Sequence, residues 1–144
     1  MGKINWTRVL LGGLTAGVVM NVLCIAAWWL FVRPSLIATL QALERPAQET
    51  VGATVLMVVL FFLMGIVAIW LYAAIRPRYG AGPGTAALAG IAAGLMFGVF
   101  PDIGWGLTLR LIPARVWAAD AVMSLVVMVI ATLLGAWVYK EETP

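Results

Sequence analysis

The sequence predicts an all-α, polytopic membrane protein with four transmembrane helices. Four long apolar runs fill most of its 144 residues, at about 6–32, 51–75, 84–100 and 114–139. A helix needs about 20 apolar residues to cross the membrane, so the third run, of about 17, needs its flanking residues as well. Hydrophobic residues make up 64% of the chain and charged residues only 10%, against roughly 25% charged residues in soluble domains. We therefore expect residues 1–144 to form a single domain that is solvated mainly by lipid.

The first apolar run is expected to be a retained helix. Its basic start, with Lys3 and Arg8, also suits a signal peptide. The apolar stretch from Val9 to Val32, however, is longer than the roughly 7–15 residues of a signal-peptide core. We therefore count this run as a transmembrane span.

The sequences of the segments between the apolar runs also predict their structure. Residues 35–44 place leucine and isoleucine on one side of a helix that Ser35 can start, which predicts a short amphipathic helix lying in the interface. Residues 101–113 are expected at the same lipid–water boundary. Residues 76–84 are rich in proline and glycine, which favours a turn between the second and third spans.

Aromatic residues and cations indicate how the spans are arranged. With four crossings, the tryptophans and tyrosines fall into two belts, as interfacial aromatic rings do. The belt near the termini contains Trp6, Trp70, Tyr72, Tyr79, Trp137 and Tyr139, and the other contains Trp28, Trp29, Trp105 and Trp117. Five Lys and Arg lie on the face with the termini and four on the other, so the positive-inside rule favours cytoplasmic termini.

The two halves of the chain resemble each other. Residues 13–22 align with residues 90–99, and residues 68–72 align with residues 135–139, in the same order. Two interpretations stay open: tandem duplication of a two-helix hairpin, or chance similarity in apolar, glycine-rich sequence. Duplicated two-span units would share one membrane orientation.

Glycines spaced by four predict close helix packing. Gly13 and Gly17 lie on one face of the first span, and Gly90, Gly94 and Gly98 lie on one face of the third. Small residues let helix backbones approach in lipid. We expect the first span to pack on the third through these seams. The alternative is that one seam docks a partner subunit, a second copy, or a flat ligand such as a carotenoid or lipid tail.

Few polar residues lie inside the spans. Asn21 is near the middle of the first span and is expected to hydrogen-bond to a neighbouring helix. Asp120 lies about one and a half turns inside the fourth span, where a carboxylate is either functional or paired. We expect an ion pair with Arg115 or Arg110. The alternative is a functional polar cluster of Asp102, Arg110, Arg115 and Asp120.

The usual catalytic and ligand-holding residues are scarce. The chain has no histidine and one cysteine, Cys24, so neither a catalytic site nor a metal site is expected. The cations are spread over both faces, which does not suit nucleic-acid binding. Bound lipid, a carotenoid, or a chlorophyll held without histidine through water, an Asn or a backbone carbonyl stays open.

Two segments, residues 5–19 and 70–80, resemble a group of small bacterial four-span membrane proteins without an assigned activity. The Arg76-Pro77-Arg78-Tyr79-Gly80 junction is the most specific part of the likeness. The resemblance implies four spans and a location in the bacterial inner membrane, and it implies no functional residues.

These observations lead to two functional hypotheses. The first is a non-catalytic accessory subunit of a larger membrane assembly, such as a respiratory or photosynthetic complex, that binds lipid or pigment. The second is a small homo-oligomeric transporter or channel, with Asp120 and Asn21 lining the pathway.

Overall fold

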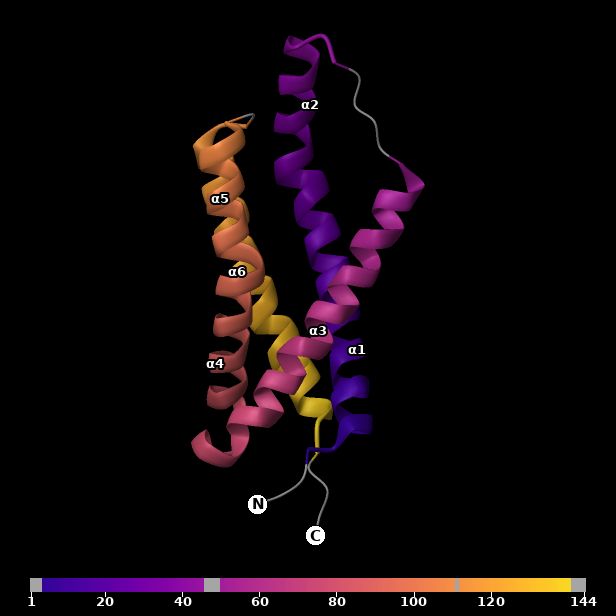
Figure 1. The fold of residues 1–144 in the computed structure, drawn as a ribbon, viewed down its shortest axis with the longest axis vertical. Helices are drawn as coiled ribbons and strands as arrows, with labels where there is room; N and C mark the ends of the chain where they lie inside the picture. Colours follow the sequence, from indigo (N-terminus) through magenta and orange to yellow (C-terminus); the bar gives the residue numbers. More distant parts are fainter. Residues whose placement is uncertain (1–3, 46–49, 111, 141–144) are drawn as a thin grey trace.

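A computed structural model describes residues 4–45, 50–110 and 112–140, and the regular structure in these ranges is helical throughout. The helices run roughly along the long axis of the molecule (Figure 1). Two five-residue π-helical turns, η1 and η2, interrupt them. The elements in chain order are α1 (Trp6–Ala27), η1 (Trp28–Val32), α2 (Arg33–Ala42), α3 (Val51–Tyr79), α4 (Pro83–Gly94), η2 (Leu95–Val99), α5 (Phe100–Leu109) and α6 (Ala114–Val138).

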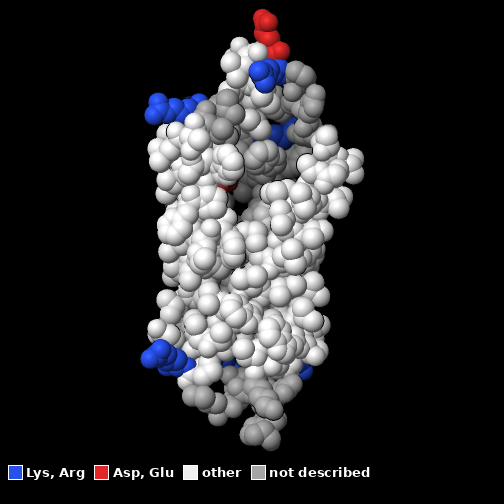
Figure 2. All heavy atoms as spheres, in the orientation of Figure 1, with Lys and Arg blue, Asp and Glu red and all other residues white. Residues whose placement is uncertain are grey.

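In the described part of the chain, four helices are long and apolar enough to cross a membrane: Trp6–Ala42, Val51–Tyr79, Pro83–Thr108 and Ala114–Val138. Large apolar side chains are exposed along all four. On the face drawn in Figure 2, Lys and Arg gather at the two ends, and the region between them is almost free of charge. An apolar band of this kind suits a lipid environment. The predicted all-α fold with four spans is thereby confirmed.

The first and third spans are longer than their apolar runs. The runs end at residues 32 and 100, but the helices continue to Ala42 and Leu109. In both spans a π-turn comes directly before an X-Pro pair, Arg33-Pro34 after η1 and Phe100-Pro101 after η2. The third span is therefore long enough to cross the membrane because its helix continues beyond Phe100.

The π-turns explain why the prolines do not end these helices. Proline has no N–H and its ring clashes with the carbonyl four residues earlier, which normally breaks an α-helix. In η1 the Arg33 N–H bonds to the carbonyl of Trp28, five residues back, and in η2 the Phe100 N–H bonds to that of Leu95. The wider turn re-spaces the hydrogen-bond ladder around the proline.

The short helix predicted at residues 35–44 is present as α2, but its setting differs from the prediction. It does not begin anew at Ser35, because Val32 and Arg33 already have helical backbone angles. Figure 1 shows α2 continuing upward from α1 rather than turning flat into an interface. The segment after Pro101 likewise continues its span as α5.

The first and last described residues meet at one end of the bundle, which we call the closed end. Asn5 caps α1 by accepting a hydrogen bond from the Arg8 N–H at 3.0 Å. Its own N–H lies 3.4 Å from the Tyr139 hydroxyl oxygen, which accepts from it. Tyr139 packs edge-on against Tyr72 with ring centroids 5.8 Å apart. The even number of crossings thus brings the two ends together.

The glycines of α1 contact α3, in a pairing that differs from the prediction. A Cβ added at Gly13 would meet the backbone of Ile66, and one at Gly17 would meet Phe62. Gly65 of α3 faces the backbone of both α1 glycines. The predicted packing of the first span on the third at these positions is therefore wrong, because their close neighbours belong to the second span.

The glycines of α4 and η2 contact α6. Added Cβ atoms at Gly90, Gly94 and Gly98 would come within 3 Å of α6 atoms at Val129, Leu125 and Ser124 respectively. Gly12 and Gly135 bring α1 against α6 in the same way. Each hairpin is thus closed by glycines of its first helix, and the seams are occupied within the chain.

The turn between α3 and α4 depends on a threonine that the sequence pattern did not single out. Thr85 is buried, and its hydroxyl donates to the carbonyls of Gly80 at 2.8 Å and Tyr79 at 3.3 Å. It therefore satisfies carbonyls at the end of α3 that have no helical partner.

Replacing Thr85 by alanine should destabilise the protein by about 1 kcal/mol, the usual cost of losing a capping hydrogen bond. Thr85→Ser keeps the hydroxyl and should cost much less. Thermal unfolding in detergent compares the two variants, and equal losses for both would contradict the capping role.

The helices separate at the opposite end, which we call the open end. In α3, residues 65, 68, 69, 72 and 73 are buried near the closed end. From Val51 to Leu60, by contrast, every residue is exposed except the half-buried Val58. Figure 1 shows the first half of α3 diverging from α1 and α2. The bundle is therefore packed at one end and splayed at the other.

Candidate functional site: a cavity at the open end

The splayed helices enclose a cavity of about 640 Å³. Every span contributes to its wall: α1, η1 and α2, the first half of α3, η2 and α5, and α6. In Figure 2 a hollow is visible in the upper half of the molecule, between the regions that Figure 1 identifies as α5 and α3. The cavity thus lies in the membrane half opposite the closed end and has an opening on the side that faces lipid.

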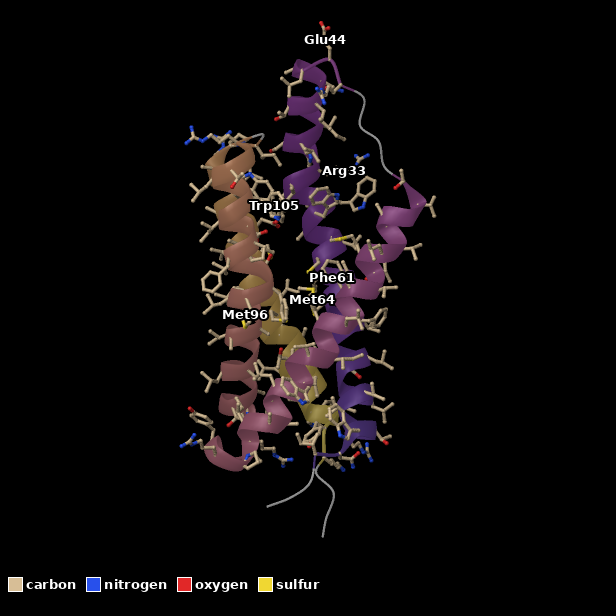
Figure 3. All side chains as sticks on the ribbon, viewed as in Figure 1. Arg33, Glu44, Phe61, Met64, Met96 and Trp105 are labelled. Carbon is tan, nitrogen blue, oxygen red and sulfur yellow. The ribbon has the colours of Figure 1, made fainter. Side chains whose placement is uncertain are left out.

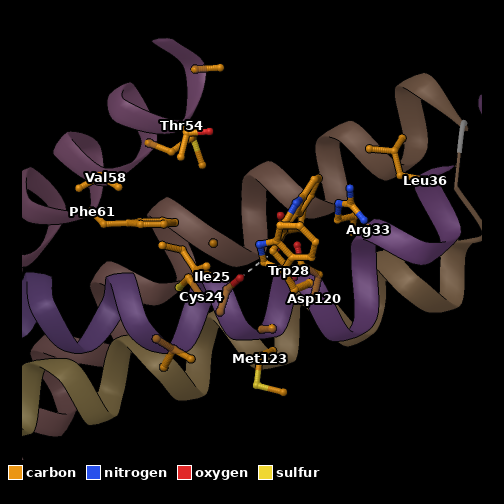
Figure 4. A pocket seen from close by; sticks show the side chains of 18 of the residues that line it. Cys24, Ile25, Trp28, Arg33, Leu36, Thr54, Val58, Phe61, Asp120 and Met123 are labelled. Carbon is orange, nitrogen blue, oxygen red and sulfur yellow. Dashed lines mark hydrogen bonds between the residues drawn. The ribbon is translucent and has the colours of Figure 1, made fainter. Parts of the chain in front are cut away.

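Aromatic side chains form much of the wall. Trp28 and Trp29 come from η1, Phe61 from α3, Phe97 from η2 and Trp117 from α6. In Figure 4 Trp28 lies in the middle of the view, with Phe61 toward one end. Figure 3 labels Arg33 of α2 and Phe61 of α3, both of which line this space. The wall is suited to a ligand with a large apolar body.

Three charged side chains of the described part of the chain also line the cavity: Asp102, Asp120 and Arg33. Both aspartates are half-buried. The Ser124 hydroxyl donates to Asp102 Oδ2 at 3.3 Å. The Arg33 guanidinium stacks on Trp29, with its central carbon 4.1 Å from the ring centroid. Charged groups at this depth in a membrane protein are costly and are a reason to look for a ligand.

The structure brings together only part of the predicted polar cluster. Asp102 and Asp120 face one cavity, whereas Arg110 and Arg115 are exposed and do not line it. The ion pair predicted for Asp120 is absent among the described residues. Arg115 and Asp120 are five positions apart on α6, and five residues at 3.6 per turn place them about 140° apart around the helix. Arg110 has left the helix, with a φ of 49° at the end of α5.

Asn21 makes the predicted contact with another helix. Its amide nitrogen donates to the Gly17 carbonyl at 2.8 Å and to the Val58 carbonyl of α3 at 3.4 Å. Its amide oxygen is buried and has no hydrogen-bond partner among the described atoms. Asn21 does not line the cavity. It therefore stands apart from the two aspartates that do.

Sequence reasoning missed several residues of the site. Trp28, Trp29 and Trp117 were assigned to an interfacial belt, and Ser124 was not considered. A signal was present in α6: Trp117, Asp120, Ser124 and Val127 recur every three or four residues and all line the cavity. The Trp117 indole nitrogen is buried without a hydrogen-bond partner in the described part of the chain.

The described residues do not gather into a set of metal-ligating side chains. Within residues 4–45, 50–110 and 112–140, no three Cys, Asp or Glu side chains come together as a possible metal site. Comparison with protein-family models, with curated proteins and with solved structures gave no match.

Proposed function

We propose that this protein is a non-catalytic, membrane-embedded binding protein whose cavity takes up an amphiphilic molecule from the surrounding bilayer. One observation carries the proposal: a cavity of about 640 Å³ with aromatic and aliphatic walls and a few charged groups. Pockets for small organic ligands typically have about 300–1,000 Å³ and this kind of lining.

The route of entry follows from the position of the cavity. Its wall includes Ala53, Thr54 and Met57, which lie on the exposed first half of α3. A molecule dissolved in the bilayer can reach this side without crossing the aqueous phase. With both termini in the cytoplasm of a bacterial cell, as the sequence favours, the cavity would draw from the outer leaflet of the inner membrane.

Two biological roles are consistent with such a site. As an accessory subunit of a larger membrane assembly, the protein would hold a resident lipid or pigment. The predicted docking glycines do not supply the contact for it, because they are occupied by helices of the same chain. Its lipid-facing apolar side chains would have to provide that contact.

Transport is the second role, and the packing gives it specific support. The helices pack closely at one end of the bundle, where Gly12 and Gly135 bring α1 against α6, while the other end encloses a cavity, as in a carrier open to one side. Uptake of a bound compound into liposomes distinguishes the two roles. A resident-ligand subunit retains its ligand and gives no flux, whereas a carrier moves it across the bilayer.

Filling the cavity should abolish ligand binding. Val58→Trp adds an indole on the cavity wall, and it should lower ligand occupancy at least about tenfold, because overpacking a filled site costs more than about 1.4 kcal/mol. Native mass spectrometry after purification in mild detergent measures the retained ligand. Val59→Trp, on the exposed face that does not line the cavity, is the matched control.

Thr54→Trp, farther along the same wall, repeats the test at an exposed position where folding is less at risk. Retention of the same amphiphile by both cavity variants and the control would overturn the proposed function.

A further inference from the structure

We propose that the molecule bound in the cavity is a hydrophobic cation, an organic ammonium or phosphonium with an aromatic or branched apolar body, anchored by Asp102 and Asp120. This inference rests on the proposed function and specifies its ligand. It is carried by the charge of the cavity lining, the lack of a partner for one carboxylate, and the aromatic wall.

Among the described residues, the cavity lining has more acidic than basic groups. It contains the carboxylates of Asp102 and Asp120 and the guanidinium of Arg33. Two carboxylates in an apolar cavity are costly unless cations or hydrogen-bond donors compensate them. A ligand carrying one positive charge would balance the excess negative charge, whereas a neutral or anionic ligand would leave or worsen it.

The two carboxylates are unequally satisfied. Asp102 accepts a hydrogen bond from the Ser124 hydroxyl. No described residue donates a hydrogen bond to Asp120 or forms an ion pair with it, and the nearby cations in sequence, Arg110 and Arg115, point elsewhere. Asp120 is therefore available to a cation that enters the cavity.

The aromatic wall favours the same class of ligand. The rings of Trp28, Trp117, Phe61 and Phe97 line the cavity with the carboxylates. Aromatic faces attract cations, most strongly where water is excluded. Asp120 and Trp28 both line the cavity and lie in the middle of the view in Figure 4, with Arg33 and Leu36 toward one end. A bulky cation can therefore contact carboxylate and aromatic groups together.

The chain provides its own reporter of occupancy. Cys24 is the single cysteine of the sequence, and it lines the same cavity. Its rate of labelling by N-ethylmaleimide should fall when a ligand fills the space. Three nearly isosteric compounds separate charge from shape: tetraphenylphosphonium is cationic, tetraphenylsilane is neutral and tetraphenylborate is anionic.

In detergent, tetraphenylphosphonium should protect Cys24 at concentrations about tenfold or more below those needed with tetraphenylsilane, and tetraphenylborate should not protect it. Equilibrium binding of radiolabelled tetraphenylphosphonium measures the same affinity without the thiol. Asp120→Asn and Asp102→Asn should each weaken cation binding about tenfold and leave binding of the neutral compound unchanged. Asparagine at position 102 can still accept from Ser124, so the fold has no reason to change there.

Glu44→Gln is the matched control. Glu44 is an exposed carboxylate at the same end of the protein and does not line the cavity. Its loss should therefore leave the binding of both the cation and the neutral compound unchanged. Each comparison between variants uses the same compound. Its partitioning into detergent is therefore the same for all variants and does not affect the difference in binding.

The outcomes separate this inference from the proposed function. The cation inference would be overturned if the protein bound the cation and the neutral compound with equal affinity and neither aspartate variant changed it. A site for amphiphiles would then still be present. Failure of all three compounds to slow labelling, with no bound radiolabelled cation, would contradict both.

Discussion

Gly65→Ala is expected to destabilise the protein by about 3 kcal/mol, near the upper end of the cost of overpacking a tight contact. A Cβ at this position would lie 2.5 Å from the carbonyl oxygen of Gly13 and 2.7 Å from the amide nitrogen of Gly17. Both are backbone atoms, which cannot rotate away as a side chain can. The added methyl group must therefore push α1 and α3 apart along the seam that holds the first hairpin together.

Gly52→Ala is the control for this prediction. Gly52 lies in the same helix, and nothing is within 4 Å of a Cβ added there. Alanine should be neutral or slightly favourable at that position, because it is a better helix former than glycine. Unfolding by heat or by SDS compares the two variants. Similar stability of Gly65→Ala and Gly52→Ala would show that the close contact of α1 and α3 does not hold the bundle together.

Ile69→Ala is expected to cost about 2 kcal/mol. Ile69 is fully buried at 0% exposure, and its methyl groups lie near Gly12 of α1 and Gly135 of α6. It therefore fills the junction of three helices. In water a buried isoleucine would also lose its transfer free energy. Separated helices in lipid still surround the side chain with hydrocarbon, so only the packing contribution is lost, and the expected cost lies at the low end of the usual range.

Leu63→Ala tests this reasoning on the same helix. Leu63 is 52% exposed and faces lipid in the folded bundle. Its environment changes little on unfolding, so truncation should change stability by less than about 0.5 kcal/mol. Equal losses for Ile69→Ala and Leu63→Ala would mean that burial between the helices adds nothing beyond contact with lipid.

Helix existence could be predicted from the sequence, and helix ends could not. Runs of about 20 apolar residues can exist in lipid only as helices, because every backbone polar group must be paired within the segment. The end of a run says less about where a helix stops. The apolar runs end at residues 32 and 100, yet the helices continue through Pro34 and Pro101, each of which follows a π-turn. Whether a proline ends a helix depends on hydrogen bonds that composition does not reveal.

The residues of the cavity were only partly recognisable. Asp120 stood out because carboxylates are rare within apolar spans, and Asp102 was grouped with it in the alternative polar cluster. Their partners were misassigned, since nearness in sequence to Arg115 was taken as nearness in space. The direction of a side chain around α6 decides this, and it places Asp120 with Trp117 and Ser124 instead.

By itself the sequence determined that the protein crosses the membrane four times as helices, because apolar length and the pairing of backbone groups are local properties. Only the tertiary structure decided which glycine faces which helix, where the helices separate, and which charged groups share a cavity. These depend on the rotation and tilt of each helix against its neighbours. Rotation and tilt are set by close van der Waals contacts between residues far apart in the chain, which local sequence patterns do not encode.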